Sequence, residues 1–412
     1  MGYRIWNPTG DAPRSMRSMA ISAASRPPDG PPGAGKAPLS TGLFAGFAIA
    51  SIGGPIALVT LLPGTAGEGI DSAGLVVVLA LAVFAAPLGI WLVYSRSVVS
   101  SGGLSAFVEA SIGRRAAIAH GWIWAGAYFL YLPYTVTFVV YDLLPPVFPG
   151  VHAYRVALEL LLPVAIVGVV FLPVRVVLAL LGVVGAAQVI VLLVVAGFEL
   201  THAHPTFASS PNVNDTGRAT GGLALLFVCA SLPLYFGSEL RGGSRAMRGV
   251  LAGSVALVGA AFLVAAVPLG AVPEQLRDAA VPGAAIAQAY SGRTLAVVVG
   301  LLTAGGTLAL IVAEYLALAR LLRWLYAIPL RTSYAWIAVP FIALDAVSLV
   351  DPDRFYDDLL KPSLGALFVS QLAVFLVFPR FRRGPAAVAA AAIASGLAAW
   401  GLYTLIAGSA AT

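Results

Sequence analysis

Eleven runs of roughly 20 apolar residues divide this 412-residue chain from about residue 40 to its end. A helix needs about that length to cross a ~30 Å hydrocarbon core. Charged residues make up only 10% of the chain, against about 25% in soluble domains, so lipid must surround these runs. We predict an all-α, multi-pass membrane protein with about 11 transmembrane helices, near 40–62, 72–94, 118–144, 153–172, 174–198, 220–240, 249–270, 294–322, 333–350, 359–378 and 385–407.

The basic residues indicate which way the helices run. They stand singly between the apolar runs, so the net charge of +6 does not indicate nucleic-acid binding. Basic residues gather in the cytoplasmic loops of membrane proteins. With a cytoplasmic N-terminus, 18 of the 24 lie inside and six lie outside: Arg155, Arg218, Arg277, Arg293, Arg354 and Lys361. We therefore predict a protein of the cytoplasmic membrane with its N-terminus inside and its C-terminus external.

The first 38 residues differ from the rest of the chain. They are polar and rich in Pro, Gly and Ser, which is typical of a disordered segment. The ten spans that follow divide into two stretches of nearly equal length. The predicted domains are a disordered cytoplasmic tail (1–38), a first five-helix repeat (39–200), a second, inverted repeat (201–379) and an accessory eleventh helix (380–412). Within the pair at 153–198, Pro173 and Arg175 are the only break.

Helix breakers lie deep inside the first and the sixth run. The first reads ASIGGP up to Pro55, and the sixth reads CASLP up to Pro233, at nearly the same depth. Proline removes a backbone donor and clashes with the preceding turn, so each helix should kink or unwind there. Such residues often serve only close packing. Matched breaks in two halves of opposite orientation, however, are typical of a transporter's midplane binding site.

Four motifs carry a family resemblance: SGGLSAFVEASIGRR (101–115) with HGW (120–122), SELR (238–241), LPG (62–64) and SLGAL (363–367). By these motifs and their order along the chain, the protein resembles the amino acid permeases of the amino acid–polyamine–organocation (APC) superfamily, from about residue 40 to 383. The resemblance implies a LeuT-type fold, a five-plus-five inverted repeat with broken helices 1 and 6. It also implies transport of an amino acid or related amine.

The chain departs from the family's pattern at three places. The first helix breaks at Gly53-Gly54-Pro55 instead of Gly-small-Gly, and the sixth has no carboxylate in its motif at 228–231. The lysine that some proton-coupled members carry in the fifth helix corresponds to about Val195. The departures leave the expected fold intact and weaken the inference about the substrate.

Substrate binding is expected at the two breaks and on the third helix. An unwound helix exposes backbone groups and two half-helix dipoles, which attract a carboxylate and an amine. The third span also places an aromatic stripe on one face, which could contact substrate or could only pack between helices. The stripe comprises Trp124, Tyr128, Tyr131, Thr135 and Phe138. The candidate residues are Ser51, Gly53, Gly54, Tyr128, Tyr131, Cys229, Ala230 and Ser231.

Glu314 is the candidate for ion coupling. It lies in span eight, six residues before Arg320 and so nearly two turns away, at a depth where a charged group costs about 2.5–3.5 kcal/mol. It should therefore face a cavity, be paired or be protonated, and a structural hydrogen bond is the alternative role. The resemblance places the family's cation site on this helix. Proton coupling through Glu314 is the leading hypothesis, and sodium coupling with Thr303 or Thr307 as ligands is its rival.

These observations favour a secondary transporter that works by alternating access. The alternative is a membrane binding or interaction protein that keeps the fold without transport. An enzyme is not expected, because the sequence holds no catalytic constellation. His202 and His204 precede Pro205 in a loop and do not indicate a metal site. The expected partners are a small-molecule substrate, a proton or sodium ion and the lipid bilayer, with no cofactor.

Overall fold

The computed structural model describes residues 39–52, 71–202, 204, 207 and 212–409. Within them the chain is helical, with one isolated bridge between Leu39 and Leu240. The α-helices are α2 (Thr41–Ala50), α4 (Ala73–Tyr94), α5 (Gly103–Ile112), α6 (Arg114–Phe138), α7 (Arg155–Val170), α8 (Val174–His202), α9 (Val213–Leu226), α10 (Gly243–Ala266), α11 (Glu274–Arg277), α12 (Pro282–Ser291), α13 (Arg293–Tyr326), α14 (Leu330–Asp345), α15 (Pro352–Phe381) and α16 (Pro385–Ser409). The π-helix is η2 (Val139–Leu143). The 3-10 helices are η3 (Pro149–Tyr154), η4 (Phe227–Glu239), η5 (Leu269–Ala271) and η6 (Ala346–Leu349).

The predicted spans correspond to these helices. Ten helices among the described residues are long and apolar enough to cross a membrane. The short α2 begins the first predicted span, whose remainder lies outside the described residues. The break between the fourth and fifth spans falls at Pro173, as predicted, because α7 ends at Val170 and α8 begins at Val174. The prediction of an all-α protein with about eleven spans is confirmed.

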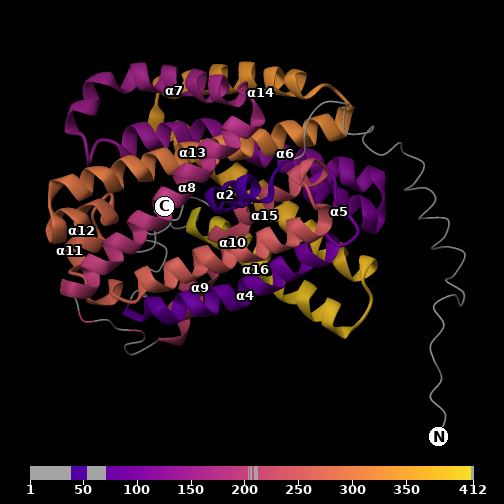
Figure 1. Cartoon of the computed structure of the whole chain (residues 1–412), viewed down its shortest axis with the longest axis horizontal. Helices are drawn as coiled ribbons and strands as arrows, with labels where there is room; N and C mark the ends of the chain where they lie inside the picture. Colours follow the sequence, from indigo (N-terminus) through magenta and orange to yellow (C-terminus); the bar gives the residue numbers. More distant parts are fainter. Residues whose placement is uncertain (1–38, 53–70, 203, 205–206, 208–211, 410–412) are drawn as a thin grey trace, which may run out of the picture. The chain divides into compact units, whose positions relative to one another are not determined.

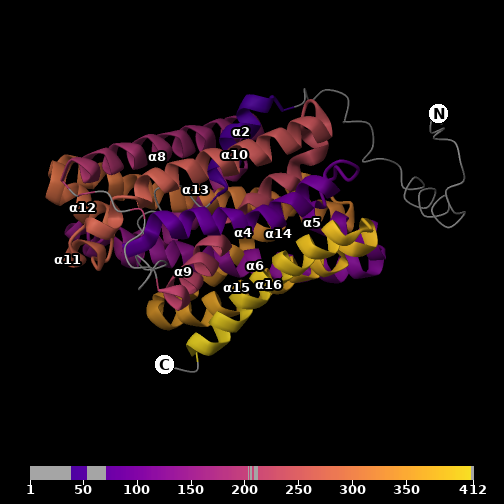
Figure 2. The same cartoon turned by 90° about the horizontal axis from the view of Figure 1, so that it is seen from below.

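Two sets of five spans follow one another along the chain. The first runs from α2 to α8 and the second from α9 to α15, and α16 packs against α15 and α4 (Figures 1 and 2). Since five is odd, the two sets enter the membrane from opposite sides. We call the side of the membrane where α2 begins the N-terminal side, and the other side of the membrane the opposite side.

Three short helices were not predicted. The helix α5 lies between α4 and α6 and ends at Gly113, whose φ of 97° suits glycine. The helices α11 and α12 lie between α10 and α13. None is long enough to span a bilayer, so a search for apolar runs of 20 residues passes over them.

Small residues let α2 approach α8 closely. A Cβ at Gly46 would lie 2.8 Å from the Cα of Gly182, and one at Gly185 would lie 3.1 Å from the backbone nitrogen of Ala50. Without side chains the two backbones come into contact, which is how membrane helices gain packing energy where lipid offers no hydrophobic drive. This contact fixes the end of α2, where the predicted site begins.

Candidate functional site

The sixth span changes its helical form where the break was predicted. α9 ends at Leu226, and the chain continues through Pro233 as the 3-10 helix η4. Cys229, Ala230 and Ser231 therefore lie outside regular α-helix, as predicted, although the chain tightens there instead of unwinding. A 3-10 stretch of 13 residues is unusually long, and such stretches inside a helix often mark a hinge.

The first span also loses its α-helix at the predicted depth. α2 ends at Ala50, and the buried hydroxyl of Ser51 donates to the carbonyl of Ala48 at 2.9 Å. Gly53 and Gly54 lie outside the described residues. α2 packs against η4, with the rings of Phe47 and Phe236 4.6 Å apart. The described start of the first span thus contacts the interrupted sixth span.

Three predicted residues meet where α6, η4 and α13 converge. The Tyr128 hydroxyl lies 4.0 Å from the Cys229 sulfur, which lies 4.0 Å from Oε1 of Glu314. Glu314 is fully buried, and its Oε2 has no hydrogen-bond partner among the described residues. It stands 12 residues before the end of α13 at Tyr326, about 18 Å along the helix axis. A carboxyl group with an open acceptor therefore lies deep in the bundle, beside the candidate substrate residues.

Aromatic side chains of α6 and η4 surround this point. The Trp124 ring lies 4.1 Å from that of Tyr128 and 4.3 Å from that of Tyr235. Tyr131 packs on Tyr134 at 5.1 Å, and both lie within electrostatic range of Glu314. The stripe predicted on the third span thus faces the site. Tyr134 and Tyr235 were missed, the first because it lies off the stripe.

Ala230 and Ser231 are both buried in η4. The Ser231 hydroxyl has no hydrogen-bond partner among the described residues. A buried hydroxyl without a partner costs about 1–3 kcal/mol, so a bound ligand or water that accepts from it would be favoured. The structure therefore leaves Ser231 able to bind a polar group.

Thr303 and Thr307 lie away from Glu314 on α13. Their hydroxyls donate to the carbonyls of Val299 and Thr303 at 2.8 and 2.9 Å. Thr307 is seven residues before Glu314, about 10 Å along the helix axis. The predicted ion-coupling residues therefore do not form one coordination shell.

Gln188 of α8, which the sequence did not single out as a site residue, lies near these threonines. Its side-chain nitrogen donates to the carbonyl of Leu302 at 3.2 Å, and its oxygen has no partner among the described residues. A Cβ at Gly306 would collide with that nitrogen, so the Gln188 side chain can lie in this position only beside a glycine. The sequence did contain a signal for Gln188, because a side-chain amide inside an apolar run is costly unless it forms hydrogen bonds or binds a ligand.

An ion pair lies between Glu314 and the N-terminal side. Arg320 of α13 donates to both carboxylate oxygens of Glu239 at 2.9 and 3.0 Å, and its guanidinium lies 3.6 Å from the Phe236 ring. The Glu239 carbonyl accepts from the Leu39 backbone nitrogen at 2.9 Å. These contacts join α13, η4 and the start of α2 in one layer, which we call the Arg320 layer. Arg320 was not among the site residues predicted from the sequence.

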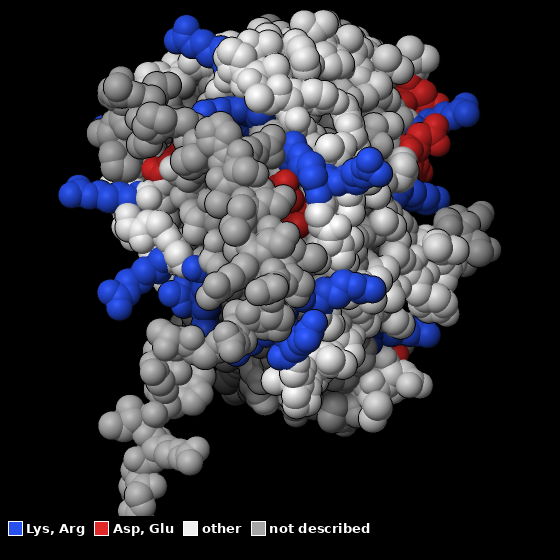
Figure 3. Space-filling model, turned by 90° about the vertical axis from the view of Figure 1, so that its right-hand side faces the viewer, with Lys and Arg blue, Asp and Glu red and all other residues white. Residues whose placement is uncertain are grey.

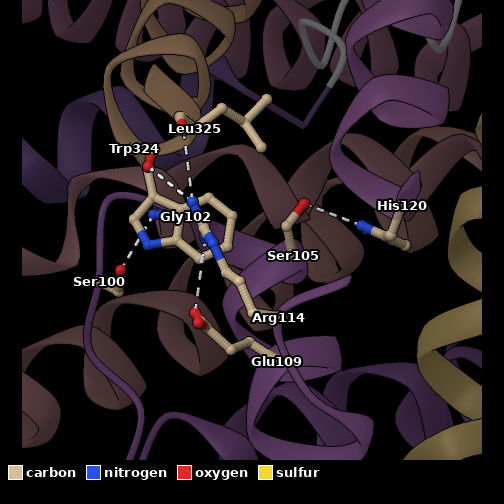
Figure 4. A network of polar contacts seen from close by, with 8 residues as sticks. All are labelled: Ser100, Gly102, Ser105, Glu109, Arg114, His120, Trp324 and Leu325. Atoms are coloured by element: carbon tan, nitrogen blue, oxygen red, sulfur yellow. Dashed lines mark hydrogen bonds and ion pairs between the residues drawn. The ribbon is translucent and has the colours of Figure 1, made fainter. Parts of the chain in front are cut away.

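The SGG segment lies at the start of α5 and packs against Trp324 near the end of α13 (Figure 4). A Cβ at Gly102 would lie 2.6 Å from the Trp324 ring, and one at Gly103, whose φ is 50°, would lie 2.5 Å from the Tyr235 ring. Arg114 stacks 3.9 Å over Trp324 and donates to its carbonyl. The glycines of the motif are therefore needed because two aromatic rings lie on the backbone.

His120 makes two buried hydrogen bonds inside the bundle. Its Nε2 donates to the carbonyl of Ser370 at 3.0 Å, and its Nδ1 accepts from the Ser105 hydroxyl at 2.8 Å. His202 stacks on the Tyr290 ring at 4.7 Å. In the described part of the chain, no three His, Cys, Asp or Glu side chains form a group that could hold a metal ion.

Solved structures of membrane transporters share this arrangement. MhsT in complex with L-phenylalanine superimposes with a TM-score of 0.61 at 13% identity, covering 88% of this chain and 97% of that one. A substrate-bound, outward-open Na+-coupled sialic acid symporter gives 0.57 at 12% identity and covers 95% of each chain. The Eremococcus coleocola manganese transporter, in complex with an aromatic bis-isothiourea substituted compound, gives 0.55 at 13% identity and covers 89% and 87%.

The comparisons define the fold class. No protein-family profile and no curated protein sequence matches the chain. At identities of 12–13%, the likeness shows the fold alone. The chain is a multi-pass membrane protein with the LeuT-type five-plus-five fold, and the proteins that share it are transporters and not enzymes. Membership of the APC superfamily stays a prediction.

Proposed function

We propose that this chain is a secondary transporter that moves an amino acid or related amine by alternating access, coupled to a cation. The observation that carries the proposal is the meeting of Glu314 with Cys229 and Tyr128 where the interrupted sixth span passes α13. A broken helix with a buried ionisable group at mid-depth is typical of a transporter's binding site. MhsT, solved with L-phenylalanine, supports the amino acid class.

The proposed substrate site comprises eight residues from three spans. Interrupted helices present backbone groups to the substrate's carboxylate and amine, and the α6 aromatics cover its side chain. The residues are Ser51, Gly53, Gly54, Tyr128, Tyr131, Cys229, Ala230 and Ser231.

Glu314 is proposed to couple proton movement to transport. In its neutral form it is held by the weak contact with the Cys229 thiol, whereas an ionised Glu314 needs a cation or water at its open oxygen. The two states favour different positions of η4 against α13, which is the differential interaction that coupling requires. Sodium is the rival ion, and Thr303, Thr307 and the open oxygen of Gln188 would be its ligands.

The Arg320 layer is proposed as the barrier on the N-terminal side. It separates Glu314 from that side and joins three spans, so release of substrate there requires Arg320 to part from Glu239. The 39–200 and 201–379 repeats would move against each other as this layer opens.

The N-terminal side is proposed to be cytoplasmic and the C-terminus external. The face that carries α5 shows many basic and few acidic side chains (Figure 3). Exposed arginines at helix ends on this side include Arg96, Arg115, Arg175, Arg241, Arg245, Arg323, Arg331, Arg380, Arg382 and Arg383. Such an excess is typical of cytoplasmic loops.

Counterflow in proteoliposomes tests the function. Vesicles preloaded with unlabelled amino acids or amines should accumulate the same labelled compound transiently, and a thermal-shift screen should identify which compound stabilises the protein. A compound that stabilises the protein without counterflow would favour the alternative, a binding protein that keeps the fold and does not transport.

A further inference from the structure

Glu159 and Asp345 form a second buried acidic pair, distinct from Glu314. They lie on α7 and α14, which pack side by side at the top of Figure 1. Their exposed fractions are 0% and 1%. Ser348, three residues after Asp345, donates to Oε1 of Glu159 at 2.7 Å, and Thr137 of α6 donates to the same oxygen at 2.6 Å. The Glu159 carboxyl group and two hydroxyl groups therefore meet where three spans come together, and Asp345 lies within electrostatic range of Glu159.

Three of the four carboxyl oxygens of Glu159 and Asp345 have no hydrogen-bond partner among the described residues. Both oxygens of Asp345 and Oε2 of Glu159 have no hydrogen bond to any described residue. Arg155, one turn before Glu159, lies 4.9 Å over the Tyr141 ring, and no described Lys or Arg forms an ion pair with either acid. Buried charges without partners cost several kcal/mol each. The pair must therefore be neutralised either by protons or by a bound cation, because no basic side chain of the described residues pairs with it.

The geometry suits a bound metal cation better than a proton. A proton on Asp345 would need an acceptor within hydrogen-bond distance, and neither of its oxygens has one among the described residues. Oxygens that share one ion at 2.3–2.6 Å stand about 3.4 Å apart, beyond a normal hydrogen bond. Four carboxyl and two hydroxyl oxygens also make a set that hard cations prefer.

A surface hollow on the opposite side lies next to this pair. Its volume is about 300 Å³, and its lining includes Asp142, Asp353, Asp357 and Thr137. Thr137 thus both lines the hollow and donates to Glu159. A depression lined by acidic groups raises the local concentration of cations.

We propose that Glu159, Asp345, Thr137 and Ser348 bind a hard cation, Na+ or Ca2+, which enters from this hollow. Bound there, the ion holds α6, α7 and α14 together at their ends on the opposite side. Glu159 is only four residues into α7, about 6 Å from its start, whereas Glu314 lies near the middle of α13. The site goes beyond the proposed transport function and stands whether or not Glu314 couples protons.

Thermal unfolding of the purified full-length protein tests this site. Na+ or Ca2+ is titrated against choline chloride at constant ionic strength and pH. We expect one of the two ions to raise the Tm saturably, because it binds the folded state. Glu159→Gln and Asp345→Asn should each weaken the apparent affinity at least tenfold. Glu274→Gln, which removes an exposed carboxylate from the same side, should leave the titration unchanged.

Carbodiimide labelling gives a second test, which works on the wild-type protein. Peptide mass spectrometry should find Glu159 or Asp345 modified in choline and protected by the stabilising ion, and Glu314→Gln should show the same protection. Stabilisation by acid alone, with labelling that neither ion reduces, would show that the pair only shares a proton. A Tm titration identical in Glu159→Gln, Asp345→Asn and the wild type would also overturn the site.

Discussion

Replacing Glu239 by Gln should open the N-terminal side of the transporter. Arg320 is fully buried, while the Glu239 side chain is 25% exposed, and two charge-assisted hydrogen bonds join them. Breaking a fully buried ion pair costs about 3–5 kcal/mol. Because Glu239 is partly solvated and Gln keeps one acceptor, we expect about 2 kcal/mol here. If the closed state alone makes the pair, the open population rises about 30-fold.

The single cysteine of the chain reports this opening without further engineering. Cys229 lies in η4 beyond the Arg320 layer and contacts Glu314. We expect a membrane-impermeant maleimide, added on the N-terminal side of oriented vesicles, to label Cys229 about 30-fold faster in Glu239→Gln. Glu109→Gln is the matched control, because it removes a carboxylate from a longer, more exposed pair with Arg114 on the same side. A Glu239→Gln protein that folds normally and labels at the wild-type rate would refute the assignment of this layer as a barrier.

Three further predictions use the same protein. Glu314→Gln should abolish proton-driven accumulation while preserving counterflow, measured by pH-jump uptake in proteoliposomes; wild-type accumulation would remove Glu314 from the coupling mechanism. Gly103→Ala should destabilise the protein by about 2–5 kcal/mol, because alanine at positive φ and its Cβ against Tyr235 are both unfavourable; Gly89→Ala, with open space around it, should leave the unfolding midpoint unchanged, and equal midpoints would contradict the packing argument. A periplasm-active reporter fused to Thr412 should be active, whereas activity of only a cytoplasmic reporter would reverse the proposed topology.

The spans could be predicted from the sequence because each is a local property. Whether a helix enters the bilayer depends on its own run of apolar residues. Even the short break between the fourth and fifth spans, at Pro173, could therefore be predicted. The depth of the sixth-span break was also predictable, since Pro233 acts on its own helix. Its form was not, because η4 tightens against neighbours that the sequence does not identify.

The site was predictable only where one residue was costly by itself. Glu314 stood out because any carboxylate at that depth needs an explanation, and α6 showed its stripe by spacing alone. Glu239 and Arg320, in contrast, are 81 residues apart, and each lies near a predicted loop where a charge is ordinary. Their pairing depends on how α13 crosses η4, and no local pattern determines that crossing.

Glu159 and Asp345 show how local sequence and tertiary packing together determine what a residue costs. Each lies within a few residues of a predicted helix end, where a carboxylate can reach water and carries no signal. Once packed, they are almost completely buried, and Ser348, three residues after Asp345, donates to Glu159 from 189 positions away in the sequence. The fold therefore turns two ordinary residues into a costly pair, and that cost is the reason to expect a bound cation. Glu314 lies on another helix and at another depth, so the two acidic sites can fill independently, and the ion dependence of stability need not match that of transport.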